Sequence, residues 1–299
     1  MKRIAAIFCS AAMTAAALAI PADAADLMTL RLAADQTAVS TDELASGDKI
    51  IKGGLYIDNY TGIANLRMIL RSEEPVLIEN GCFTPDPDGA LDSDGNVRDA
   101  FFEQHSTHFY TQKSTVDDDT NIVVWGGEEI GKEGRYLANG VIRHAECPFL
   151  SFEYRIPKDA KVGDYTCYIS DKVATTQSGM LVEDLAVSDE KHQLTLGEEF
   201  AIQPVVFTVY TRGDVNCDGK VSLEDAQAAL NCYVKQNLAK KTLSDKEYSE
   251  IVKTKLVNAA RLAADASGDG EQDVKDAQGI LQYYVTELAG HAADWSRIF

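Results

Sequence analysis

The chain has 299 residues, in which 28 Lys and Arg stand against 47 Asp and Glu, giving a formal net charge of -19. Nucleic acid is a poor partner for so acidic a chain, because binding a duplex requires a positive surface that releases counterions. With 45% hydrophobic and 25% charged residues, the composition is that of a folded protein, and domains of roughly 150 residues predict two of them.

The first 24 residues have the pattern of a secretory signal peptide. Lys2 and Arg3 precede an apolar run at 4–20, and small residues at 22–24 fit a cleavage site. The run is shorter than the roughly 20 residues that a membrane span needs. We therefore expect a secreted, extracellular protein without a membrane span, held at a cell surface only through partner binding.

From about residue 27 to residue 210, apolar residues alternate with polar ones, as in strands that bury one face. The clearest runs lie at 66–71, 150–156 and 205–209, with turn residues between them. Many short strands joined by Gly- and Asp-containing turns predict an all-β sandwich of two sheets for residues 25–210. Within the Asp/Gly-rich insertion at 85–120, we interpret residues 92–96 as a solvated turn rather than a metal loop.

Beyond residue 212 the apolar period changes to 3.6, which predicts helices. One helical face carries Ala226, Ala229, Leu230 and Val234, and another carries Ala277, Ile280, Leu281 and Val285. Residues 211–299 are thus predicted to form a small all-α domain. The connection at 211–213 is too short for a flexible tether, so we expect the two domains to lie close together.

The helical region contains a duplicated acidic loop of twelve residues, and the second copy begins 51 residues after the first. Acidic or polar residues alternate along each copy, and glycine stands at position 6, where the chain must reverse sharply. This is the spacing of an EF-hand loop, in which alternate oxygens point at one hard cation. The candidate ligands are Asp214, Asn216, Asp218, the Lys220 carbonyl, Ser222 and Asp225 in the first loop, and Asp265, Ser267, Asp269, the Glu271 carbonyl, Asp273 and Asp276 in the second.

Two Ca²⁺ ions are therefore predicted, with Asp/Gly-rich turns as the alternative interpretation. The second site is expected to be weaker, because Ser267 is a poorer ligand than an amide or carboxylate. Each loop ends in Asp rather than the longer Glu, and a helix follows each loop. A loop and one helix, duplicated, resembles a dockerin, the calcium-binding module that attaches proteins to bacterial cellulosomes; the resemblance covers about 213–290.

The dockerin resemblance implies binding to a cohesin of another scaffoldin through the start of each helix. The residues at these positions are Leu223 and Glu224 in the first repeat, and Val274 and Lys275 in the second. The apolar member is kept and the charge differs, so the two faces should not be equivalent and a dual binding mode is not expected. The alternative for Leu223 and Val274 is ordinary packing. The insert at 236–264 is longer than in many dockerins and is expected to form its own helix.

Three segments of the first domain, at 61–71, 121–129 and 149–170, resemble cohesin strands in the same order. This resemblance implies a nine-stranded, jelly-roll-like sandwich whose flat face receives the dockerin of an enzyme or another component. The matching positions on that face are Asn65, Arg67 and an acidic residue, Glu128 or Glu129. Together the two resemblances imply a non-catalytic cellulosome adaptor scaffoldin.

The first domain has two alternative functions, carbohydrate binding and hydrolysis. A dockerin-bearing carbohydrate-binding protein, which would target the complex to plant polysaccharide, could use Trp125 and Tyr136 to stack on sugar rings. A hydrolase would need paired carboxylates in a recognisable frame, and none is present; His105 and His108 have metal-like spacing without a third ligand.

Five cysteines follow the signal peptide. They are Cys82, Cys147, Cys167, Cys217 and Cys232. Their spacing fits no zinc pattern. Two disulfides are possible in an oxidising exterior, but mostly free and half-buried thiols are the interpretation we favour.

Overall fold

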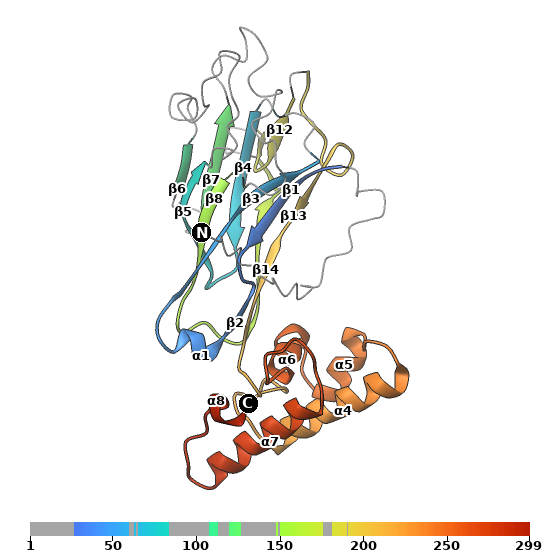
Figure 1. The fold of residues 1–299 in the computed structure, drawn as a ribbon. Coiled ribbons are helices and arrows are strands. Elements are labelled where there is room, and N and C mark those ends of the chain that lie inside the picture. Colours follow the sequence, from blue (N-terminus) through green and yellow to red (C-terminus); the bar gives the residue numbers. More distant parts are fainter. Residues whose placement is uncertain are drawn as a thin grey trace, which may run out of the picture.

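The computed structural model describes residues 27–59, 63, 65–83, 108–112, 120–126, 148, 150–175, 181–189 and 191–299. Within these ranges the chain forms two β-sheets followed by a group of helices (Figure 1). None of the helices found there combines the length and the apolar character that crossing a bilayer requires.

One sheet has five strands in the order β13-β1-β3-β8-β5. These strands are β1 (Met28–Ala34), β3 (Lys49–Asp58), β5 (Leu77–Phe83), β8 (Leu150–Ile156) and β13 (Phe200–Gln203). β1 runs parallel to β13 and antiparallel to β3, with Leu32 opposite Leu55. β8 is the partner of both β3 and β5, so it lies inside the sheet.

The other sheet has seven strands in the order β2-β14-β9-β4-β7-β6, with β12 paired to β4. These strands are β2 (Ala38–Ser40), β4 (Asn65–Ser72), β6 (His108–Gln112), β7 (Thr120–Gly126), β9 (Gly163–Ser170), β12 (Ala186–Ser188) and β14 (Val205–Tyr210). A two-stranded hairpin follows β9 and is formed by β10 (Val173–Thr175) and β11 (Leu181–Glu183). A short helix, α1 (Thr41–Leu44), joins β2 to β3.

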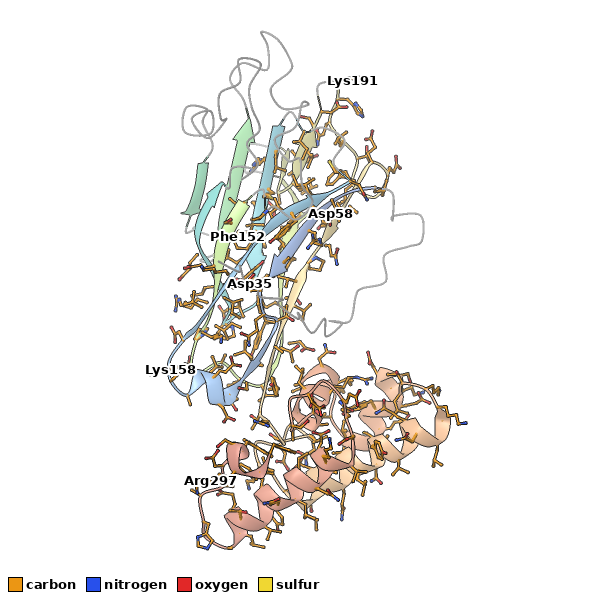
Figure 2. The ribbon with its side chains drawn as sticks, in the orientation of Figure 1. Asp35, Asp58, Phe152, Lys158, Lys191 and Arg297 are labelled. Carbon is orange, nitrogen blue, oxygen red and sulfur yellow. The ribbon has the colours of Figure 1, made fainter. Side chains whose placement is uncertain are left out.

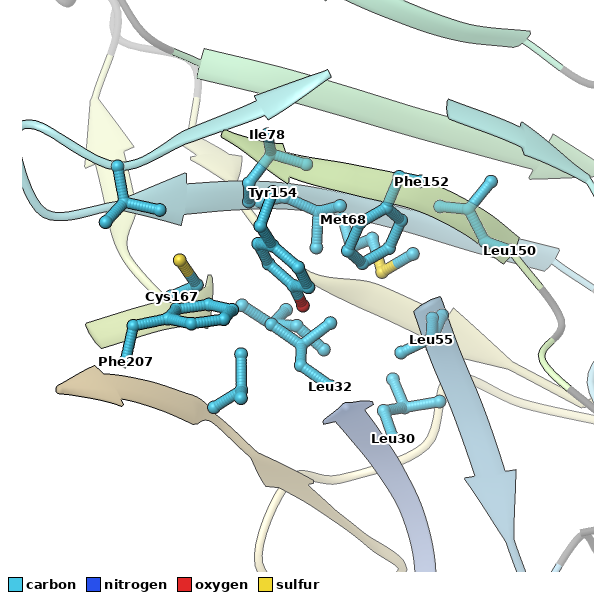
Figure 3. Close-up of a cluster of buried hydrophobic side chains, with 14 of the residues drawn as sticks. Leu30, Leu32, Leu55, Met68, Ile78, Leu150, Phe152, Tyr154, Cys167 and Phe207 are labelled. Carbon is cyan, nitrogen blue, oxygen red and sulfur yellow. The ribbon is translucent and has the colours of Figure 1, made fainter. Parts of the chain in front are cut away.

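The core of the sandwich lies between the two sheets, and the alternation in the sequence places the side chains there. Along β8, Leu150, Phe152, Tyr154 and Ile156 are buried while the residues between them are half-buried. They meet Met68 of β4, Cys167 of β9 and Phe207 of β14 from the facing sheet (Figure 3). The predicted all-β sandwich is confirmed.

The helical module begins after β14. Its helices are α4 (Leu223–Ala239), α5 (Asp245–Val252), α6 (Val257–Ala264), α7 (Val274–Leu288) and α8 (Trp295–Ile298). α4 packs against α7 and α5, and the module has its own core, which includes Cys232, Tyr248 and Ile280. The insert between the two acidic loops forms two helices, α5 and α6, where the sequence predicted one.

The two ends of the helical module are held together by aromatic contacts. Trp295 of α8 stacks on Tyr283 of α7 with ring centroids 4.2 Å apart. The Arg212 guanidinium lies 5.0 Å from the Trp295 ring centroid and 5.5 Å from that of Phe299. These cation–π contacts join the first residues of the module to its last ones.

The helical module contacts the sandwich through α6, which packs against β9 and β14 (Figure 1). Asp164 of β9 accepts a hydrogen bond from the Asn258 side chain at 2.9 Å and another from the Thr208 hydroxyl at 2.7 Å. The Thr41 hydroxyl lies 3.1 Å from the Thr211 hydroxyl. The two domains lie close together, as the short connection between them predicts.

Candidate functional site

The first acidic loop is folded by hydrogen bonds from its own backbone to its first and last carboxylates. Asp214 accepts from the Asp218 and Gly219 amides at 3.1 and 2.9 Å. Asp225 accepts from the Asn216 and Ser222 amides, both at 2.9 Å. Gly219 has φ +90°, a conformation that residues with a Cβ adopt at a cost.

The second loop repeats this arrangement. Asp265 accepts from the Gly268 and Gly270 amides, both at 2.9 Å, and Asp276 accepts from the Ser267 and Asp273 amides, both at 2.8 Å. Gly270 has φ +88°. The repeat in the sequence is therefore a repeat in the structure, with the same two carboxylates closing each loop.

The last carboxylate of each loop also begins the next helix. Asp225 and Asp276 are the third residues of α4 and α7, and each accepts the amide of the residue that caps its helix. In the first loop the Ser222 hydroxyl also donates to Asp225 at 2.7 Å. Because one carboxylate serves both the loop and the helix, the shape of the loop fixes where the helix starts.

The closing carboxylates are buried without a cationic side chain. Asp214, Asp225, Asp265 and Asp276 are all buried, and none of them forms an ion pair within the described part of the chain. The pKa of Asp214 is raised to about 6, chiefly by burial; the Gly219 amide opposes this shift and the neighbouring Asp225 contributes to it. Burial likewise raises the pKa of Asp225 and of Asp265. Such an environment favours a bound cation, since buried charges need a compensating partner.

The donor set of each loop fits a hard cation such as Ca²⁺, which takes six to eight oxygens. Among the described residues, no three His, Cys, Asp or Glu side chains are grouped so as to hold a metal ion by themselves. The carboxylates would therefore have to act with the Asn216 amide and the Lys220 carbonyl in the first loop, and with the Ser267 hydroxyl and the Glu271 carbonyl in the second. A carboxylate oxygen can accept more than one bond. The carboxylates that accept backbone amides can therefore still coordinate a cation.

The four predicted partner-binding residues stand at the start of the two helices and are accessible. Leu223 and Glu224 open α4, Val274 and Lys275 open α7, and all four are exposed. Leu223 and Val274 are absent from the module core, so ordinary packing does not account for them.

Larger apolar residues continue from these positions along both helices. Leu223, Leu230 and Val234 of α4 and Val274, Leu281 and Val285 of α7 are between 37% and 52% exposed. These six residues are called the paired stripe. Each residue of α4 has its counterpart in α7 at the 51-residue offset of the loops.

Sequence periodicity alone did not separate the paired stripe from the core. It grouped Leu230 and Val234 with Ala226 and Ala229, and the structure divides that face: the alanines are buried where α4 meets α7, while Leu230 and Val234 stay exposed. The signal in the sequence was the choice of alanine, because small residues allow close approach of two helices and leave bulkier neighbours outside the contact.

The predicted residues of the sandwich face lie on β4 and beyond. Asn65 begins β4 opposite Ser188 of β12, and Arg67, which is half-buried, lies opposite Ala186. Glu128, Glu129 and Tyr136 lie outside the described residues, as do His105 and the turn at 92–96. Trp125 lies on β7 opposite Leu66 and His108 begins β6, but the side chains of Asn65, Trp125 and His108 fall outside the described part.

Further along β4, Arg71 contributes to a polar contact that the sequence did not indicate. Its guanidinium lies 3.5 Å from the Asp184 carboxylate, which also accepts the Ser170 hydroxyl at 2.6 Å. Asp184 is buried and follows β11 directly. This contact joins β4 and β9 to the segment after the hairpin.

Three cysteines are described, and all three are free. Cys167 and Cys232 are buried and Cys217 is half-buried. Burial raises the pKa of Cys232 to about 11. The free-thiol interpretation is confirmed for these three residues, whereas Cys147 and the side chain of Cys82 lie outside the described residues.

Comparisons with known proteins gave structural likeness only. No protein-family model and no curated protein matches the sequence. A type II cohesin domain from the cellulosome of Acetivibrio cellulolyticus is 9% identical, with 60% of this chain and 95% of that chain covered and a TM-score of 0.35. A type I cohesin–dockerin complex from Clostridium thermocellum gives 11% identity, 60% and 99% coverage and a TM-score of 0.37. A non-cellulosomal cohesin from the archaeon Archaeoglobus fulgidus gives 9% identity, 62% and 92% coverage and a TM-score of 0.34. At these values the likeness carries no conclusion about function.

Proposed function

We propose that the protein is a secreted, non-catalytic adaptor that joins two binding partners. Its helical module is a dockerin-type plug that binds a cohesin of another scaffoldin in a calcium-dependent way. Its sandwich is a cohesin-like domain that receives the dockerin of an enzyme or another component. The adaptor thereby changes which proteins can enter a complex.

The paired stripe is the observation that carries this proposal. Six bulky apolar side chains are exposed on two neighbouring helices, at equivalent positions after equivalent loops. Exposed apolar side chains on one helix are common, but two matched rows are more than a monomeric surface needs. A helical face with apolar residues at this spacing is suited to a preformed protein surface.

The two acidic loops supply the calcium dependence. The carboxylate, amide, hydroxyl and carbonyl oxygens described above would hold one Ca²⁺ in each loop, and the ion would neutralise carboxylates that the fold buries. Asp225 and Asp276 both close their loops and begin their helices. Loss of loop shape would thus displace the helices that carry the paired stripe.

The position of the helical module is consistent with this role. α6 contacts the sandwich through Asn258 and Asp164, while α4 and α7 lie on the side of the module away from the strands (Figure 1). The paired stripe is accordingly not covered by the first domain of the same chain. A second protein could reach it without separating the two domains.

Support for the cohesin-like role of the sandwich comes from its sequence resemblance and from the placement of β4. At Asn65 and Arg67, β4 lies between β7 and the short strand β12, so both residues belong to a paired strand rather than to an edge. Ile63, two residues before β4, is buried. The basic Arg67 would favour acidic contacts on the partner.

A binding experiment on the full mature chain tests both halves of the proposal. Immobilised protein is probed with a panel of cohesins and a panel of dockerins, in calcium and after chelation. Leu230→Asp and Leu281→Asp are each expected to weaken cohesin capture at least tenfold, because a charge would be buried in an apolar contact. The matched control is Ile50→Asp, an apolar residue of similar exposure on β3 of the sandwich, which should leave capture unchanged.

Dockerin capture by the sandwich is tested in the same format with Arg67→Glu. Lys52→Glu on β3, in the other sheet, serves as the control. Cohesin capture that survives chelation, or that Ile50→Asp reduces as much as Leu281→Asp, would rule out the plug. Failure of every dockerin to bind would contradict the adaptor role. The helical module would then still bind a cohesin, but the sandwich would have no assigned function.

A further inference from the structure

The segment between the two acidic loops has the opposite charge balance from the rest of the chain. Residues 235–261 contain six Lys and one Arg against one Asp and two Glu, in a chain whose net charge is -19. Neither the loops nor the paired stripe uses these basic residues. A positive patch on an acidic protein attracts anions locally while the remaining surface repels them.

Part of this basic segment lines a groove. The groove has a volume of about 690 Å³ and lies between the C-terminal end of α4 and the second acidic loop. Lys240, Lys241 and Arg261 are its basic residues. A volume of this size is within the range of small-molecule sites, which span about 300–1,000 Å³.

Two of the three cations are already engaged. Arg261 donates to the Leu243 carbonyl at 2.8 Å and to Asp245 at 3.1 Å, and its guanidinium lies 4.3 Å from the Tyr248 ring centroid. Lys241 lies 3.2 Å from Glu247. Arg261 is thus a fixed part of the wall.

Lys240 differs from the other two cations because it has no acidic partner within the described part of the chain. It ends α4 in the left-handed conformation, with φ +51°, and is exposed. Lys240 therefore supplies the unneutralised charge of the groove.

The remaining lining is suited to a hydroxyl-rich ligand. The Gln236 amide and the Thr242 hydroxyl line the groove and have no hydrogen-bond partner among the described residues. Tyr233, one helical turn before Gln236 on α4, adds a half-buried aromatic ring to the lining. An aromatic ring with several amide and hydroxyl groups recognises ligands that combine flat apolar faces with hydroxyl groups.

The opposite wall carries negative charge and limits the orientation of an anion. Glu271 is exposed there, and Asp273 accepts the Lys275 amide at 2.6 Å. A carboxylate of the ligand would consequently lie at the Lys240 end, away from Glu271, with a ring of the ligand toward Tyr233.

We propose that this groove binds a carboxylated oligosaccharide, with a sugar carboxylate at Lys240 and a ring against Tyr233. The groove residues belong to neither the paired stripe nor the sandwich face, but Gly270, Glu271 and Asp273 belong to the second acidic loop, so the inference rests on the calcium-loaded loop of the proposed function. It assigns a role to the basic segment at residues 235–261, which lies between the two acidic loops.

Calorimetric titration of the full mature chain with trigalacturonate, in calcium, tests the proposal. The controls are a neutral trisaccharide and inorganic phosphate. Lys240→Glu is expected to weaken trigalacturonate binding at least tenfold, and Tyr233→Leu, which keeps apolar bulk, at least threefold. Lys246→Glu makes the same charge change on α5 outside the groove and should alter binding less than twofold.

Each other outcome would overturn the proposal in a recognisable way. Equal binding of the neutral trisaccharide would remove the role of Lys240, and binding of phosphate alone would leave a plain anion site. Equal losses for Lys240→Glu and Lys246→Glu would indicate general attraction by the basic insert. Absence of trigalacturonate binding in a chain that still captures a cohesin would reject the groove while leaving the adaptor function intact.

Discussion

At the scale of single residues, the sandwich core contains a polar atom without a partner. The Tyr154 ring packs against Phe152 and Phe207, with ring centroids 5.1 and 4.6 Å apart, and its hydroxyl points between the sheets (Figure 3). The hydroxyl is buried and makes no hydrogen bond to any described residue. Burial raises the pKa of Tyr154 well above its usual value. Leaving such a group unpaired costs about 1–3 kcal/mol.

Tyr154→Phe is therefore expected to stabilise the sandwich by about 1 kcal/mol, because it removes an unpaired hydroxyl and keeps the ring. Denaturant-induced unfolding followed by near-ultraviolet circular dichroism measures the change. Tyr165→Phe is the control, since the Tyr165 hydroxyl donates to the Lys161 carbonyl at 2.8 Å, and its loss should destabilise by up to about 1 kcal/mol. Destabilisation of both variants by the same amount would show that Tyr154 has a partner after all.

At the scale of secondary-structure elements, the strands of the sandwich could be predicted because their side chains alternate. β8 is the clearest case, with buried residues at every second position; β4 buries Leu66, Met68 and Leu70 and also Ile69. The helices α4 and α7 could be predicted from the change of period. Pairing of distant strands, such as β1 with β13, could not be predicted, because it depends on the whole sheet and not on local pattern.

The part of the candidate site that depends on the spacing of residues in the sequence could be predicted. The part that depends on how the helices pack, and hence on which side chains are exposed, could not. Residues with side-chain oxygens recur at fixed positions in each loop, so the candidate ligands Asp214 and Asp265 could be found without a structure. Exposure of Leu230 depends on how the helices of the module pack, which buries Ala226 and Ala229 and leaves Leu230 outside the core. The basic insert shows in the charge pattern, but the groove at Lys240 requires the fold.

The segment between β12 and β13 contains a charged cluster whose strength should depend on pH. His192 lies 2.8 Å from Glu199 and 3.4 Å from Asp189, and Glu199 also accepts the Thr195 amide at 2.8 Å. The neighbouring Lys191 lies at the end of the sandwich away from the helices (Figure 2). The hydrogen bond to Glu199 raises the pKa of His192, an effect that Lys191 opposes, and the bond to His192 lowers the pKa of Glu199.

The two shifts define a pH window for this segment. Because the pKa of His192 is raised, its contribution to stability is complete below its unfolded value, near 6.5, and is lost as pH rises through the folded value. Because the pKa of Glu199 is lowered, its contribution is complete above about 4.3 and is lost as pH falls through the folded value. Protection of the Thr195 amide from hydrogen exchange, corrected for intrinsic rates, is expected to peak near pH 5–6 and to fall toward pH 8.

His192→Gln should abolish this fall, because glutamine does not titrate. The other charges that face the pair are Asp189 and Lys191, and Gln193 holds Glu183 at 2.9 Å nearby. A variant that keeps the wild-type profile would show that His192 is not the group whose titration controls this segment.

At the scale of the whole molecule, the two domains are coupled through one acidic residue. Asp164 of β9 accepts hydrogen bonds from Thr208 of β14 and from Asn258 of α6. The same helix ends at Ala264, directly before the second acidic loop, and the Gly213 amide donates to the Ala263 carbonyl at 2.9 Å. A change in the conformation of the acidic loops could thus be transmitted to the strands through α6, because no flexible linker separates the two domains.

Calcium is expected to protect the β9–β14 edge of the sandwich although the proposed ion sites lie outside it. Each site saturated at 100 times its dissociation constant would stabilise the helical module by about 2.7 kcal/mol, and the contact of α6 with β9 would pass part of this to the strands. Hydrogen exchange of residues 163–170 and 205–210, with and without calcium, measures the transfer.

Asp164→Ala should reduce that calcium-dependent protection of the strands while leaving the stabilisation of α4 and α7 in place. It removes the interdomain hydrogen bond from Asn258 and the bond from Thr208 within the sandwich, at a cost of about 1 kcal/mol each. Asp159→Ala alters an exposed turn residue close in sequence and should keep the wild-type response. Calcium protection of the strands that persists in Asp164→Ala would mean that the coupling runs through the chain at Arg212 rather than through α6. Calcium that protects neither the strands nor α4 and α7 would instead count against ion binding in the loops themselves.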